Sequence, residues 1–145
     1  MKNLVLSWPA WALASAFFAA LTAIFGKLGV EQINSDFATF LRTIIVLMLL
    51  GLIVVLTGAW QPLGEIPRRT YIFLGLSALA TGASWLCYYR ALQLGPASAV
   101  APIDKLSLLL VALLAFTFLG ERLAPTGWIG VGLMASGAVL LALKA

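Results

Sequence analysis

Two adjacent charged residues, Asp104 and Lys105, lie inside an otherwise apolar stretch of the sequence, a few residues after Pro102. A charge within a bilayer costs about 2.5–3.5 kcal/mol on insertion scales, so such residues are usually functional. Adjacent positions of a helix point about 100° apart, and we therefore expect the two side chains not to pair with each other. Arg90 is a candidate partner for Asp104, and Lys105 is a candidate for a water-filled cavity. We assign both to substrate binding or ion coupling.

Three further basic residues, Lys27, Arg42 and Arg90, lie within or at the edges of apolar stretches. If successive stretches cross a membrane in alternating directions, all these charges fall near one membrane face. One interpretation is a pathway for a substrate or an ion, and the net positive charge then favours zwitterionic or anionic metabolites. The alternative is an interfacial belt of salt bridges with snorkelling side chains, which is favoured for Lys27 and Arg90.

A polar stripe follows the third apolar stretch. Its members recur at helical spacing i, i+4, i+7 and i+11 and share one face of a helix: Ser77, Thr81, Ser84 and Tyr88. Trp85 and Tyr89 flank the stripe. Hydroxyl groups with aromatic walls are typical of small-molecule sites, whereas small hydroxyl residues also let membrane helices pack closely. We assign Ser77 to packing, and the pathway to Thr81, Ser84, Trp85 and Tyr88, with Trp11 from the first stretch.

The elements that position these residues are five apolar stretches. Of the 145 residues, 63% are hydrophobic and 10% are charged, against about 25% charged in a soluble domain. Each stretch reaches the roughly 20 residues that a membrane-spanning helix needs, and none alternates as barrel strands do. We therefore predict an all-α membrane protein of one domain, 1–145, with spans near 8–30, 37–57, 71–92, 99–119 and 126–143. The long first stretch indicates a span, not a signal peptide.

The charges outside the spans indicate the topology only weakly. With five spans, the basic residues divide into two sets. Lys2, Arg68, Arg69 and Arg122 lie on one side, and Lys27, Arg90 and Lys144 lie on the other, with Arg42 and Lys105 deeper in their helices on that second side. So small a bias is compatible with one fixed orientation and with insertion both ways round. Glycines in the fifth stretch permit close helix contact, within the chain or against a partner.

Several classes of protein are excluded. The sequence has no histidine, a single cysteine (Cys87) and no basic patch, which excludes histidine metal sites, an intramolecular disulfide and nucleic-acid binding. It contains no phosphate-binding glycine loop and no nucleophile with a neighbouring base. We expect no enzymatic activity, no catalytic residues, no metal and no cofactor.

Several motifs together resemble the EamA domain of the drug/metabolite transporter superfamily. The segments 88–92 (YYRAL) and 95–102 (GPASAVAP) resemble the junction of its third and fourth helices, and 119–123 (LGERL) resembles the end of its fourth. Trp128-Ile129-Gly130 with Gly137 resembles its fifth helix, and Lys27 and Arg42 also fit. The order and spacing of these motifs over the whole chain carry the resemblance.

The resemblance implies a secondary transporter of a small metabolite or drug-like molecule, driven by an ion or substrate gradient, in a bacterial or archaeal inner membrane. Most members have two such repeats in inverted orientation, whereas this chain has one, so a second copy is expected to complete it as an antiparallel homodimer. The alternatives are half of a heterodimeric transporter and a non-transporting membrane subunit. The first-helix glutamate of the small multidrug exporters has no counterpart here.

Overall fold

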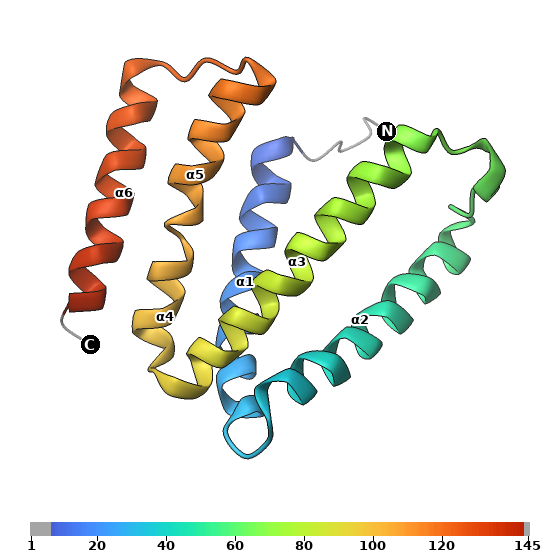
Figure 1. Ribbon diagram of the computed structural model, residues 1–145, viewed down its shortest axis with the longest axis horizontal. Coiled ribbons are helices and arrows are strands. Elements are labelled where there is room, and N and C mark those ends of the chain that lie inside the picture. The colour runs from blue at the N-terminus through green and yellow to red at the C-terminus, as the bar shows by residue number, and fades with distance from the viewer. Residues whose placement is uncertain (1–6, 144–145) are drawn as a thin grey trace, which may run out of the picture. The chain divides into compact units, whose positions relative to one another are not determined.

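The computed structural model describes residues 7–143, and all the regular structure in this range is helical. Its long helices are α1 (Trp8–Val30), α2 (Ser35–Thr57), α3 (Arg68–Leu94), a fourth span over Ala97–Leu119, and α6 (Pro125–Leu143) (Figure 1). Within the described residues, five helices are long and apolar enough to cross a membrane, which confirms the predicted all-α membrane fold. Lys2 and Lys144, used above for topology, lie outside the described residues.

Capping residues set the two limits of α2. Asn34 caps α2, because its side-chain oxygen accepts hydrogen bonds from the backbone N–H groups of Asp36 (2.8 Å) and Phe37 (3.2 Å). Gly58 ends α2 with a left-handed φ of 64°, which glycine adopts without strain. The cap at Asn34 lets α2 start two residues before the expected position 37.

The fourth span is broken, whereas we expected one helix over 99–119. It consists of α4 (Ala97–Asp104), α5 (Ser107–Leu114) and a π-helical turn (Ala115–Leu119) that ends at Gly120, whose φ is 69°. Pro102 has no N–H to donate to the preceding turn and crowds it, which weakens the helix at this point. The interruption comes after Asp104, where the N–H groups of Lys105 and Leu106 donate to the carbonyls three residues earlier, Pro102 (3.1 Å) and Ile103 (2.9 Å).

The chain divides into two compact units, of which one comprises Gly29–Gln93. In this unit, the Gln93 Nε2 donates hydrogen bonds to the carbonyls of Val30 (3.3 Å) and Ile33 (2.9 Å), and so ties the end of α3 to the loop before α2. At the opposite end of α3, the Tyr71 hydroxyl donates to the Leu63 carbonyl (2.8 Å) in the loop after α2. Hydrogen bonds therefore tie both ends of α3 to loops, one end to the loop before α2 and the other to the loop after it.

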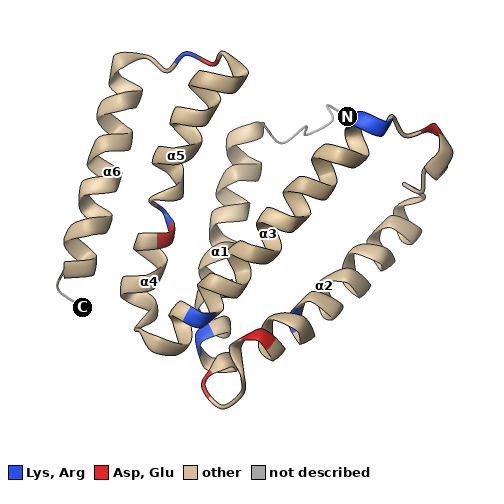
Figure 2. Cartoon of the chain, in the orientation of Figure 1, with Lys and Arg blue, Asp and Glu red and all other residues tan. Residues whose placement is uncertain are grey.

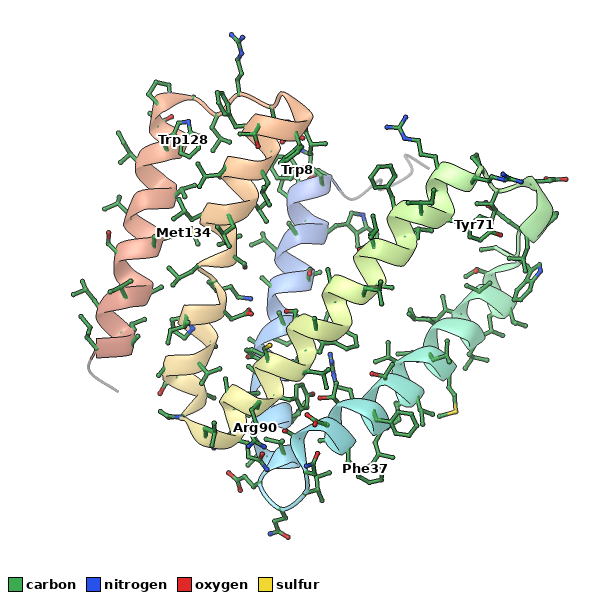
Figure 3. All side chains as sticks on the ribbon, in the orientation of Figure 1. Trp8, Phe37, Tyr71, Arg90, Trp128 and Met134 are labelled. Atoms are coloured by element: carbon green, nitrogen blue, oxygen red, sulfur yellow. The ribbon has the colours of Figure 1, made fainter. Side chains whose placement is uncertain are left out.

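The other unit comprises the residues before Gly29 and after Gln93. Within it, α4 and α5 both pack against α6. The rings of Phe116 and Trp128 meet edge to face with centroids 6.5 Å apart, at the end of α6 where Figure 3 labels Trp128. Small buried residues, among them Ala99, Ala112 and Ala138, allow the helices to approach closely.

Most of the apolar surface of the spans is not covered by the chain itself. In the most apolar windows of α2 and α3, only 6% and 0% of the residues are buried. Large side chains such as Leu47, Phe73 and Leu79 are well exposed. An apolar surface of this extent requires lipid or another protein chain as its neighbour.

Candidate functional site

A groove of about 560 Å³ lies between α2 and α3, inside the unit Gly29–Gln93. Its volume falls in the range of small-molecule sites. From α2 it is lined by Asp36, Thr39, Phe40 and Thr43. From α3 it is lined by Leu74, Ser77, Ala78, Thr81, Gly82, Trp85 and Leu86. The lining is thus mainly apolar, with hydroxyl groups on both helices and one carboxylate.

The threonine hydroxyl groups of the groove already donate hydrogen bonds within their own helices. Each donates to the backbone carbonyl four residues earlier, Thr39 to Ser35 (2.9 Å), Thr43 to Thr39 (2.7 Å) and Thr81 to Ser77 (2.8 Å). This arrangement is usual in membrane helices, where it satisfies the hydroxyl proton locally. The lone pairs of the oxygen atoms remain for a ligand, so the groove offers hydrogen-bond acceptors to groups that donate.

Arg42 lies beside the groove, and Trp85 connects the two. The guanidinium carbon of Arg42 is 4.1 Å from the centroid of the Trp85 ring and 5.5 Å from that of Tyr89. Both distances are within the range of cation–π attraction. Arg42 is the eighth residue of α2, about 10 Å along the helix from its start, and therefore lies within the span. Its Nη1 atom is buried and has no hydrogen-bond partner among the described residues.

Asp104 and Lys105 pair with each other, so the prediction of separate partners was wrong. The Lys105 Nζ lies 3.1 Å from the Asp104 Oδ2. The prediction assumed a regular helix, whereas the chain turns at the junction of α4 and α5 and brings the neighbouring side chains together. Figure 2 shows this adjacent pair at the junction, while most other charges lie near helix ends or in loops.

Of the remaining predicted site residues, Thr81 and Trp85 line the groove and Arg42 adjoins it. Ser84 and Tyr88 do not line the groove, although the Tyr88 ring lies 6.4 Å from the ring of Tyr89.

Arg90 is exposed near the end of α3, as Figure 3 shows. Trp11 and Lys27 lie on α1, in the part of that helix that belongs to the other unit.

Thr39 and Thr43 were not among the residues predicted from the sequence, and Tyr89 was predicted only to flank the stripe of α3. Asp36, Thr39 and Thr43 recur at helical spacing, as the stripe of α3 does. A search for the same helical spacing in the second span would have identified Thr39 and Thr43. The stacking of Arg42 on Trp85 depends on how two helices meet, and no spacing within one helix indicates it.

These features define an integral membrane protein with a mainly apolar groove, which carries a few hydroxyl groups, beside a charged residue inside a span. The model of the EamA-like transporter family matches residues 6–143, and the chain belongs to this family. This confirms the resemblance on which the sequence analysis relied.

Several curated proteins are similar to the chain. An uncharacterized transporter in the cobO 3' region of a Sinorhizobium species is 60% identical over 136 residues, which cover 94% of this chain and 96% of that protein. A probable 4-amino-4-deoxy-L-arabinose-phosphoundecaprenol flippase subunit ArnE of Hamiltonella defensa is 35% identical over 59% of this chain and 75% of its own length. The uncharacterized transporter YwfM of Bacillus subtilis is 33% identical over 50% of this chain and 24% of its own length. No solved structure gives a significant match.

Proposed function

We propose that the chain is a secondary transporter of a small metabolite or drug-like molecule and that it belongs in a bacterial or archaeal inner membrane. The observation that carries this proposal is the groove between α2 and α3, with Arg42 held against Trp85 inside the span. Charged residues inside a membrane are expensive and usually mark a pathway. The pathway we propose includes Arg42, Thr81 and Trp85. Asp104 and Lys105 are proposed to take part in substrate binding or ion coupling. The other predicted pathway residues stay part of the proposal: Trp11, Lys27, Ser84, Tyr88 and Arg90.

The transporter works, in this proposal, as an antiparallel homodimer with alternating access. Transporters built from inverted repeats bind their substrates between the two halves, and a chain with a single repeat obtains its second half from another chain. The nearly unburied faces of α2 and α3 are available to such a partner. On α6, Gly130 and Gly137 share one face, and a Cβ added to either would meet no atom of another described element within 4 Å, so this face also admits close contact.

The test is flux into proteoliposomes that contain only this chain, for a broad panel of metabolites, together with the sidedness of a tag on each terminus in cells. We expect flux of at least one compound above that of protein-free vesicles, and each tag detected on both sides of the membrane. The weak charge bias is the physical reason for expecting both orientations. Termini confined to one side would contradict the antiparallel homodimer.

A second candidate is one half of a heterodimeric transporter, and the names of the ArnE relatives favour it, because they describe flippase subunits. In that case the chain alone gives no flux, and flux appears when a second chain of opposite orientation is present. A non-transporting membrane subunit would give no flux in either preparation.

A further inference from the structure

Among the described residues, Arg42 forms no salt bridge with an acidic side chain. The sequence contains five acidic residues, Glu31, Asp36, Glu65, Asp104 and Glu121. Glu31, Glu65 and Glu121 lie outside the long helices, and Asp104 is paired with Lys105. Asp36 is in the first turn of α2, where its negative charge interacts favourably with the N-terminal end of the helix dipole. It lies about 9 Å along the helix axis from Arg42.

A guanidinium inside a membrane without a counter-ion is costly, and a buried donor without an acceptor adds to that cost. The Nη1 atom of Arg42 is such a donor among the described residues. The rings of Trp85 and Tyr89 attract the cation but accept no strong hydrogen bond from it. A negatively charged ligand would satisfy both the charge and the donor.

We propose that Arg42 is the binding group for an oxyanion, a carboxylate or a phosphate, carried by the transported substrate. The inference rests on the proposed transport function and names the class of its substrate. Arginine suits this role better than lysine, because its planar group stacks on an aromatic ring while its edge donates to two oxygen atoms of an oxyanion.

The groove beside Arg42 indicates which chemical groups the rest of the substrate carries. Its threonine oxygens accept hydrogen bonds, and Phe40 and Leu86 contribute apolar surface. The groove therefore fits a body that donates hydrogen bonds from hydroxyl or amino groups and also has an apolar face. Such an oxyanion is either a soluble metabolite or the head group of a lipid, and the two sources share the same chemistry at Arg42.

The test is equilibrium binding of radiolabelled probes to the purified full chain. The probes are inorganic phosphate, glucuronate as a hydroxylated carboxylate, and dioctanoyl phosphatidic acid as a lipid-borne phosphate, with glucose as the uncharged counterpart of glucuronate. We expect saturable binding of at least one anionic probe and none of glucose. Arg42→Gln should weaken that binding at least tenfold, and Arg42→Lys should weaken it less.

The matched control is Arg69→Gln. Arg69 is another arginine of the same unit, its guanidinium lies 5.6 Å from the Phe73 ring, and it does not line the groove. Its replacement should leave binding unchanged. Binding of phosphatidic acid alone would assign the lipid source, and binding of phosphate or glucuronate alone would assign the soluble one. Equal binding by wild type and a correctly folded Arg42→Gln or Arg42→Lys variant overturns the inference, as does a wild type that binds no anionic probe.

Flux measured on the same preparations separates this inference from the proposed function. If wild type and Arg42→Gln transport a neutral or cationic compound equally well, transport stands and the oxyanion site is wrong. If wild type binds an oxyanion through Arg42 but no compound crosses the membrane, the site stands and the transport function is wrong.

Discussion

Trp85→Leu should lower both oxyanion binding and flux by about ten- to thirtyfold. The Trp85 ring lies 4.1 Å from the guanidinium carbon of Arg42 and also forms part of the groove wall. A cation–π contact away from water is worth about 2 kcal/mol, and each 1.4 kcal/mol corresponds to about a factor of ten in affinity. Without the ring, the arginine side chain is free to extend toward the polar end of the span and leave the groove. Binding of the probes above and proteoliposome flux measure the effect.

Trp85→Phe keeps an aromatic face and should cost only a few-fold, because phenylalanine attracts a cation less strongly than tryptophan does. The control is Trp60→Leu, since Trp60 lies in the loop after α2 and is 71% exposed. It should leave binding and flux unchanged. If Trp85→Leu behaves as Trp60→Leu does, the stacking of Arg42 on Trp85 has no part in binding.

Asp104→Asn and Lys105→Gln should each lower the free energy of unfolding by about 2–3 kcal/mol. Each replacement leaves the other member of the pair as an unpaired charge about a third of the way along the fourth span. The double variant removes both charges and should be more stable than either single variant. Equilibrium unfolding in mixed micelles, followed by loss of helical signal, gives the four values of the cycle.

The matched control is the pair Glu121 and Arg122, an adjacent acid and base in the loop after the fourth span. Their replacement by glutamine should change stability by less than about 0.5 kcal/mol, because loop charges remain in water. If the losses from Asp104→Asn and Lys105→Gln simply add in the double variant, the two groups do not stabilise each other. Flux by the stable double variant then tests the proposed coupling role, because transport by a chain without both charges would assign the pair to structure alone.

The spans could be predicted from the sequence because membrane insertion depends on the length and composition of each segment. The limits of α1 and α2 follow from this rule together with the cap at Asn34 and the glycine at position 58. The role of Trp85 in the groove wall was also within reach, because the helical spacing of α3 places Thr81 and Trp85 close together along the helix.

The contacts of the charges were harder to predict. The expectation for Asp104 and Lys105 assumed regular helical geometry, and the turn after Pro102 removed that assumption. The position of the Arg42 guanidinium on Trp85 joins residues 43 positions apart, and it depends on how α2 and α3 lie relative to each other. Composition and periodicity describe one helix at a time, so they contain no information on such a contact.

Chemical blocking of the groove while flux is measured tests most directly whether substrate passes between α2 and α3. In a Cys87→Ala background, which removes the chain's single cysteine, Thr43→Cys places a thiol in the groove and Leu50→Cys places one on α2 outside it. Both variants are labelled to completion with a bulky maleimide, checked by mass spectrometry, and reconstituted. Labelled Thr43→Cys should lose at least nine-tenths of its flux, about a tenfold loss, while labelled Leu50→Cys should keep its flux. Undiminished flux through fully labelled Thr43→Cys would contradict the claim that substrate passes through this groove.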